Sequence, residues 1–509
     1  MLEQVSRSTL RGLQVLSLSL LLGEVMWLRV RFELSLIVLF LLALTGCGGS
    51  GNGGAGPING PFSNSSLSGS YAFSFTGVNQ FGFLAVAGTF QANGSGTITS
   101  GTLDVNSGNG VFTNQSLTGN YNVHNNGQGT ATLVANAGTF DINFVMISTR
   151  RALVIRFDNN STASGSIDAQ SPSAFSLSAL GGTFAFNLSG ILDASEHILV
   201  SAGAIDNDGA GTIPSGVQDN NENGTPVLNQ GVTGSNAVST TKGRGTMTLN
   251  TGLGTLQFAF YVVDNNQIKL IEIDTLPVLA GDAFRQVFPQ STASVSGPLA
   301  FTVGGESSGF PFAAGGVLVT DGAGHVTSGT QDINNGGSIA QNVSVTGTYL
   351  VGADGRGSLT LNGSTGTTNF IIYPTTSGVQ MLQVDVGESN IGAAFSQVGP
   401  FSNSTVSGTY GLNLTGVTSA NNEIDSSGQF TADGAGHLTG ALDVNNGGGL
   451  TSNLSLSGNY SVASNGRGTA TINSAFGPQN LILYTVSNGR VVFIEVDSNL
   501  VAVGEMDHQ

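Results

Sequence analysis

The sequence feature that most constrains the fold is a motif that occurs four times at nearly equal intervals. Its fourth copy is DGAGHLTGALDVNNG at residues 433–447, and the earlier copies lie at residues 93–108, 208–224 and 321–336. The aspartates that the copies share are 115, 113 and 111 residues apart; they are Asp104, Asp219, Asp332 and Asp443. A repeat of fixed period indicates one structural unit used several times. We therefore expect four tandem units, at residues 61–172, 173–289, 290–399 and 400–509.

Each unit has the pattern of about eight short strands. The first begins with LSGSYAFSFTG, in which Tyr71, Phe73 and Phe75 alternate with small or polar residues, as expected when one face of a strand is buried. Asn-Gly or Asp-Gly pairs such as Asn93-Gly94 and Asn126-Gly127 separate the strands and favour two-residue type I′ hairpins. Seventy-six glycines and only 9% charged residues agree with short strands and tight turns. Neighbouring strands are thus predicted to be antiparallel.

The predicted fold class is all-β, with an eight-stranded antiparallel up-and-down β-barrel in each repeat of about 110 residues. Closing an eight-stranded meander removes the exposed edge strands that promote aggregation. Eight strands leave an interior that is filled by side chains or holds one small ligand. A β-sandwich per repeat is the alternative. The opening strand loosely resembles that of avidin-like barrels, and the architecture is similar to that of lipocalins, although no ligand-site pattern of either family is present.

The N-terminal segment has the layout of a secretory signal peptide. An apolar run, LSLIVLFLLALTGC, ends at Cys47 and follows Arg29 and Arg31. The residues Leu44-Thr45-Gly46-Cys47 resemble the lipobox of bacterial lipoprotein precursors, which implies that Cys47 is acylated and that residues 1–47 are the signal. A start at Met26 would give a signal of ordinary length. The Gly-rich residues 48–60 are expected to form a flexible tether.

The N-terminal segment implies that the protein is exported and that the membrane is its partner through the lipid. In the lipoproteins that this segment resembles, an Asp directly after the cysteine signals retention in the inner membrane. Gly48 occupies that position here, so the resemblance implies that the protein is located in the outer membrane or at the cell surface. The repeats are also similar to Gly/Ser/Asn-rich secreted repeat proteins of soil bacteria, which implies export but no activity. The net charge of −17 argues against nucleic acid as a partner. Because Cys47 is the single cysteine, an intramolecular disulfide framework is excluded.

An Asp and an Asn two residues later recur in every repeat and are candidates for turn capping or calcium binding. They are Asp104, Asn106, Asp219, Asn221, Asp332, Asn334, Asp443 and Asn445. Such side chains commonly bond to nearby backbone N–H groups. Residues 219–224 match the start of an EF-hand loop, but its twelfth position is Gln230 instead of an acid. Turn capping is therefore the main expectation, with calcium as the alternative, and no other metal or cofactor is expected.

A second acid recurs at the end of the seventh predicted strand. It is Asp158, Asp274, Asp385 or Asp497, preceded in two repeats by Glu272 or Glu495. Carboxylate pairs can hydrolyse glycosides, but four copies at strand ends suggest solvated structural positions. No G-x-S-x-G triad and no P-loop can be assembled from the sequence. We therefore expect no enzymatic activity, and an envelope hydrolase ranks third among the functions.

The function that the sequence favours is a non-catalytic binding or structural module of the cell envelope. In the alternative, each barrel carries a small molecule or glycan in its mouth. Interior aromatic residues would line that site; the candidates are Tyr71, Phe73, Phe184, Phe186 and Tyr410. If the barrels are filled instead, the repeats would display adhesive or spacing surfaces, with a protein ligand as a further option. The sequence does not specify which ligand is bound.

Overall fold

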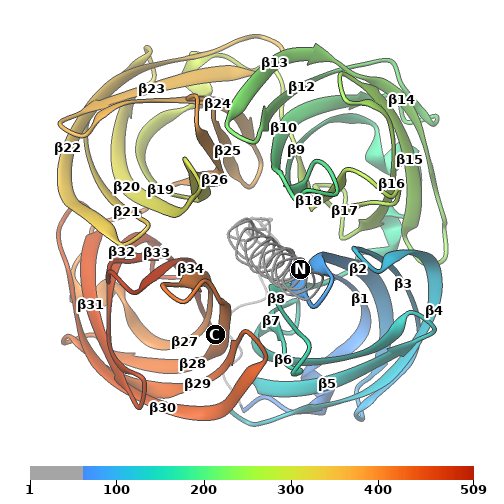
Figure 1. Ribbon diagram of the computed structural model, residues 1–509, viewed down its shortest axis with the longest axis horizontal. Helices are drawn as coiled ribbons and strands as arrows, with labels where there is room; N and C mark the ends of the chain where they lie inside the picture. The colour runs from blue at the N-terminus through green and yellow to red at the C-terminus, as the bar shows by residue number, and fades with distance from the viewer. Residues whose placement is uncertain (1–60) are drawn as a thin grey trace, which may run out of the picture.

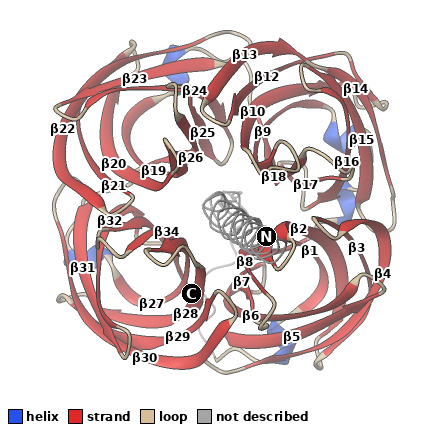
Figure 2. Cartoon of the chain, viewed as in Figure 1, coloured by secondary structure: helices blue, strands red, loops and turns tan. Residues whose placement is uncertain are grey.

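The computed structural model describes residues 61–509, which fold almost entirely as β-strands with a few short helical turns (Figure 2). The predicted signal peptide, the lipid acceptor Cys47 and the Gly-rich tether lie outside the described residues. None of the helices within residues 61–509 is long and apolar enough to cross a membrane.

Four barrels follow one another along the chain, as predicted (Figure 1). The strands of the first are β1 (Ser68–Asn79), β2 (Gly82–Asn93), β3 (Thr97–Ser107), β4 (Gly110–Val123), β5 (Gln128–Ala135), β6 (Gly138–Ser148), β7 (Arg151–Arg156) and β8 (Ser161–Ala169). Every consecutive pair is antiparallel, and β1 pairs with both β2 and β8. This closure makes the unit a barrel and rejects the β-sandwich alternative.

The second unit is a curled ten-stranded sheet in which two long strands are each divided in two. Its strands are β9 (Gly182–Ile191), β10 (Ile198–Asn207), β11 (Thr212–Ile213), β12 (Ser215–Glu222), β13 (Thr225–Gly231), β14 (Thr233–Val238), β15 (Arg244–Thr251), β16 (Gly254–Val262), β17 (Gln267–Glu272) and β18 (Val278–Arg285). Pro214 separates β11 from β12 because proline has no N–H to donate to the ladder. The backbone N–H of Val232 still donates to the Gly216 carbonyl, so the two divided strands stay in contact.

The third and fourth units are closed eight-stranded barrels like the first. The third contains β19 (Ser296–Ser307), β20 (Phe310–Asp321), β21 (His325–Asn335), β22 (Ser338–Val351), β23 (Gly357–Gly363), β24 (Gly366–Thr375), β25 (Gly378–Gln383) and β26 (Glu388–Ser396). The fourth contains β27 (Ser407–Thr418), β28 (Glu423–Asp433), β29 (His437–Asn446), β30 (Gly449–Val462), β31 (Arg467–Ser474), β32 (Gly477–Ser487), β33 (Arg490–Glu495) and β34 (Leu500–His508).

Short 3-10 turns lead into the barrels. They are η2 (Asn64–Ser66), η3 (Pro172–Ala174), η4 (Ser178–Leu180), η5 (Thr292–Ser294) and η6 (Asn403–Thr405). In η2, η5 and η6 a serine before the turn and a Ser or Thr at its third position form a reciprocal capping box. The same entry to the barrel is thus built three times from the same local chemistry.

The predicted two-residue hairpins are wrong in detail. Between β2 and β3 the loop has three residues, and the Asn93 side chain accepts hydrogen bonds from the N–H groups of Ser95 and Thr97. Gly94 and Gly96 both have positive φ, at 75° and 99°, which explains the glycines there. The turn that contains Asn126-Gly127, between β4 and β5, spans residues 124–127. The Asn-Gly signal located the turns correctly but not their length.

The four barrels form a ring in which the last barrel contacts the first (Figure 1). Strand β28 of the fourth barrel packs against β6, β7 and β8 of the first, just as β2 of the first packs against β16, β17 and β18 of the second. Each contact joins different faces of two similar units, and such head-to-tail contacts form a ring when the rotation closes. The molecule therefore has approximate fourfold symmetry.

Candidate functional site

The first repeated aspartate links two barrels. Asp104 lies within β3 and is fully buried. Its carboxylate accepts two parallel hydrogen bonds from Arg244 of the second barrel, Nη2 to Oδ1 at 2.7 Å and Nε to Oδ2 at 2.8 Å. The Tyr261 hydroxyl donates to Oδ2, and the Asn114 backbone N–H donates to Oδ1 at 2.7 Å. Burial, then the nearby Asp104 charge, raises the pKa of Tyr261 well above its usual value, so the phenol stays a donor.

The next two barrel junctions repeat this arrangement. Asp219 pairs with Arg356 and accepts from Tyr373, and Asp332 pairs with Arg467. The hydroxyl of Tyr484 completes the third set, 3.0 Å from Asp332. Bidentate Arg–carboxylate pairs have a fixed geometry, so each sets the orientation of one barrel on the next.

The fourth junction, which closes the ring, has different partners. Gln128 and Val145 of the first barrel stand where the other junctions have Arg and Tyr. Asp443 accepts instead from the Asn143 side chain at 3.0 Å and from the Asn453 backbone N–H at 2.7 Å. Asp443 therefore lacks the bidentate arginine partner that the other three aspartates have.

The repeated asparagines and a terminal glutamine also bond across the junctions. The Asn106 amide donates to the carbonyls of Glu272 and Asp274 in the next barrel, at 2.9 and 2.7 Å. Asn221, Asn334 and Asn445 donate to the equivalent carbonyls of the barrels that follow them. The glutamine that ends each repeat does the same; the four are Gln170, Gln286, Gln397 and Gln509. In the last of these, Gln509 donates to the Met146 carbonyl of the first barrel at 2.6 Å.

The sequence interpretation of the Asp and Asn residues was thus incomplete. Each Asp does accept from a backbone N–H on the following strand, as capping predicts. In three of the four carboxylates, however, both oxygens also accept hydrogen bonds from an arginine of the next barrel, 135 to 140 residues away in the chain. No cluster of three or more His, Cys, Asp or Glu suited to a metal occurs in residues 61–509. The recurrence of Arg244, Arg356 and Arg467 at one repeat position was the signal that could have revealed the pairing.

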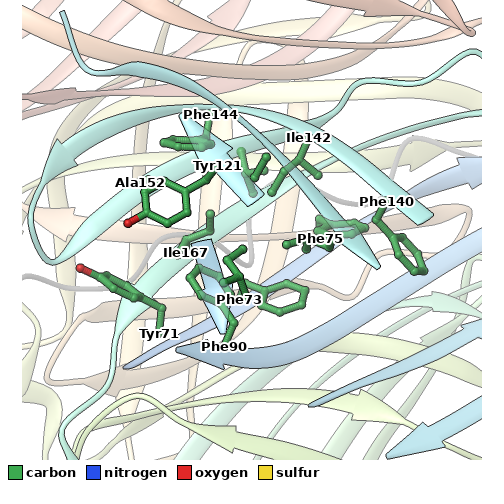
Figure 3. Close-up of a cluster of buried hydrophobic side chains, with 14 of the residues drawn as sticks. Tyr71, Phe73, Phe75, Phe90, Tyr121, Phe140, Ile142, Phe144, Ala152 and Ile167 are labelled. Atoms are coloured by element: carbon green, nitrogen blue, oxygen red, sulfur yellow. The ribbon is translucent and has the colours of Figure 1, made fainter. Parts of the chain in front are cut away.

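The aromatic residues predicted to line a ligand lie in the packed barrel cores, and Figure 3 shows Tyr71 and Phe73 in the first of these cores. Tyr71, Phe73, Phe184, Phe186 and Tyr410 are all at most 2% exposed. The Tyr71 ring stacks on Phe90 with centroids 5.6 Å apart, and its hydroxyl donates to the Thr149 carbonyl at 2.8 Å. Burial raises the pKa of Tyr410 to about 12, and its hydroxyl donates to a backbone carbonyl. These side chains fill the barrels.

The second set of repeated acids bonds to the backbone of its own barrel, and the expectation that all of it is solvated was wrong. Asp274 and Asp497 accept from the backbone N–H of Gln257 and Asn480. Glu272 and Glu495, two residues earlier, are fully buried. Burial, with a hydrogen bond to the neighbouring Asp, raises the pKa of each to about 10. The adjacent barrel covers these positions, which a single repeat would leave exposed.

A chain of ion pairs runs through three barrels. The fully buried Lys269 ammonium of the second barrel lies 2.9 Å from Asp168 of the first and 3.5 Å from Asp282. Arg151 contacts Asp168 at 3.0 Å and reaches Glu505 of the fourth barrel at 3.1 Å. Burial would raise the pKa of Asp168, but Lys269 and Arg151 outweigh it and hold the pKa at about 2. Two cations here bridge three carboxylates that belong to three barrels, so the network is an additional link between barrels.

A cleft of about 670 Å³ opens at the closing junction. Turns of the first and fourth barrels form it, at residues 78–82, 159–162 and 421–423, with Glu196 reaching in from the second barrel. Next to it the outward face of β28 is polar. Glu423, Asp425 and Ser427 occupy the register positions that Phe83, Ala85 and Ala87 hold in β2. The Thr162 hydroxyl of the first barrel donates to Asp425 at 2.7 Å.

Compared with protein-family models and with curated proteins, the sequence matches none of them.

Proposed function

We propose that this protein is an exported, lipid-anchored, non-catalytic module of the bacterial envelope, in which four barrels form one ring-shaped scaffold. The observation that carries the proposal is the use of the repeated residues. In every repeat the same Asp, Asn and Gln positions bond to the next barrel, and the fourth repeat bonds to the first. The residues that recur in every repeat therefore hold the four barrels together in the ring.

The packed cores support a scaffold over a carrier that uses the barrel mouths. Residues such as Phe73 and Phe186 occupy the volume that a ligand would need. Protein interiors at native density leave little room for an added molecule. A binding role would then use surfaces between barrels.

The anchoring part of the proposal depends on Cys47 and is tested by fractionation. The full chain and a Cys47→Ser variant are produced in a Gram-negative host and separated into membrane and soluble fractions. We expect the parent in the membrane fraction with an acylated N-terminal cysteine by mass spectrometry, and the variant without the lipid. A mature parent that begins upstream of Cys47, or that stays in the cytosol, would refute the lipoprotein assignment.

A further inference from the structure

The cleft at the closing junction has the size and lining of a ligand site. Its volume of about 670 Å³ lies within the range of small-molecule sites, roughly 300–1,000 Å³. Three different barrels contribute to it, and a site at the junction of domains is a common place for a ligand. The cleft exists only in the assembled ring, since a single barrel supplies only part of its wall.

One aromatic ring and two aliphatic side chains form the apolar part of the cleft. Phe81 lies in the β1–β2 turn and is 49% exposed, while Val78 and Val417 flank it from two barrels. The other aromatic residues of the first barrel are buried or partly buried. The Phe81 ring offers a flat apolar surface for a ligand to lie against.

The polar part of the cleft consists of amide, hydroxyl and carboxyl groups. Amides come from the first and fourth barrels, among them Asn79, Asn160 and Asn422. The hydroxyls of Ser161 and Thr162 also lie in the lining, where they donate to Asp158 and Asp425 and can still accept a hydrogen bond. No Lys, Arg or His is among the described residues that line the cleft. Amides and hydroxyls both donate and accept hydrogen bonds, so the lining matches a ligand that does the same.

Two carboxyl groups complete the lining. Glu423 is only 6% exposed, and its Oε2 has no hydrogen-bond partner. The Glu196 carboxyl fills the space above Gly82, where a Cβ would lie 1.7 Å from its Oε1, and its Oε2 is also buried without a partner. Burial raises the pKa of both, that of Glu423 well above its usual value with Asp425 adding to the effect. Buried polar atoms without protein partners are places where a ligand or water can complete the bonding, and these two border the cleft.

The closing junction differs from the others at the position of Glu423. The equivalent residues of the first three barrels are Phe83, Ile198 and Pro311, all without a polar side chain. A fourfold scaffold would be stable with an apolar residue here, as the other three junctions demonstrate. A buried acid at this one position costs stability, so it points to a role other than packing.

We propose that this cleft binds a neutral saccharide of one to three rings, with an apolar sugar face against Phe81 and the hydroxyls on the amide and carboxyl groups. Anionic ligands would meet two acids and no cation. An ammonium group donates but cannot accept, so it would leave the amide donors of the lining unused. The proposal goes beyond the scaffold function, since binding does not require the lipid anchor.

The test measures binding to the purified full chain in detergent by isothermal titration calorimetry. The probes are the neutral disaccharides maltose, cellobiose and N,N′-diacetylchitobiose. Spermidine is the probe for binding of an amine. We expect at least one disaccharide to bind with a Kd of about 1 mM or tighter and spermidine not to bind. Binding of spermidine alone, or of no disaccharide at about 10 mM, would overturn the proposal.

Variants connect the binding to the cleft. Phe81→Ala is expected to weaken saccharide binding about tenfold or more, and Phe81→Trp to keep it. The matched control is Phe310→Ala, which removes a 60% exposed phenyl ring beside the corresponding β19–β20 turn of the third barrel and should leave affinity unchanged.

Glu423→Gln should keep binding within about threefold, whereas Glu423→Ala should lose it. Equal affinities of the parent and Phe81→Ala proteins, with unchanged thermal unfolding, would place any binding elsewhere and refute the site. Because none of these measurements depends on acylation, their failure is distinct from failure of the anchoring proposal.

Discussion

Arg244 in the second barrel holds Asp104 in the first through two parallel hydrogen bonds of 2.7 and 2.8 Å, although 140 residues separate them. The Asp104 side chain is completely buried, and that of Arg244 is 14% exposed. A buried pair of this kind contributes orientation as well as energy, and losing one partner leaves the other charge without compensation.

Replacing Asp104 with Asn should lower the free energy of unfolding by about 3 kcal/mol, because the Arg244 charge would stay buried without its counterion. Chemical denaturation followed by circular dichroism measures the effect. The double variant Asp104→Asn, Arg244→Met should recover most of the loss, since no unpaired charge then remains. A loss below about 1 kcal/mol in the single variant would show that the pair does not hold the junction.

Supplying the missing partners at the closing junction should stabilise it. The double variant Gln128→Arg, Val145→Tyr gives Asp443 the same neighbours that Asp104 has, and we expect a gain of about 2 kcal/mol. Slower hydrogen–deuterium exchange in β6 and β28 reports the change. Adding Asp443→Asn should cancel the gain. Exchange that stays as fast as in the parent would contradict the equivalence of the four junctions.

The closing junction should weaken as pH rises from about 4 to about 6. Burial raises the pKa of Asp425 to about 6, with the Thr162 hydrogen bond opposing the rise, and Glu423 lies two residues away on the same strand. In the unfolded chain an Asp has a pKa near 4. Between these values the unfolded state releases its proton while the folded state keeps it, so stability falls by about 3 kcal/mol and then levels off.

Denaturant midpoints at about pH 4.5 and pH 7 test this behaviour. The Asp425→Asn variant has no proton to lose, so its midpoint should fall less over the interval than that of the parent. Other buried acids are common to both proteins and cancel in the comparison. If the denaturant midpoint falls by the same amount in both proteins, Asp425 ionises as it does in water.

Lys269→Met should destabilise the ring by about 3 kcal/mol or more near neutral pH, because Asp168 and Asp282 would face each other without the ammonium between them. Protonation of the acids at low pH should relieve part of this loss, so the difference from the parent should narrow toward about pH 4. Thermal unfolding at the two pH values measures it. Lys242→Met, at an exposed turn of the same barrel, is the control and should change little. A loss that is the same at both pH values would point to packing instead of charge.

Local patterns in the sequence predicted the fold of each barrel but not the contacts between one barrel and the next. Alternation in residues 67–77 placed Tyr71, Phe73 and Phe75 on one face, and all three lie in the first core. The Asn-Gly signals located turns because positive φ is a local requirement, yet loop lengths depended on side-chain bonds such as those of Asn93. Asp104 and Asp443 have nearly the same flanking sequence, and only one of them has an arginine partner. Their difference is encoded in Arg244 and Gln128, far away in the chain.

The sequence by itself determined the number of units, the strand order within each and the antiparallel pairing, since these follow from periodicity and turn chemistry within about ten residues. Tertiary structure alone decided that the units close into a ring, that the repeated Asp, Asn and Gln residues join barrels, and that an acid-lined cleft opens where Glu423 replaces an apolar residue. The physical reason is that a junction depends on the outward faces of two folded barrels. Residues such as Glu272 are solvated or buried according to what packs on them.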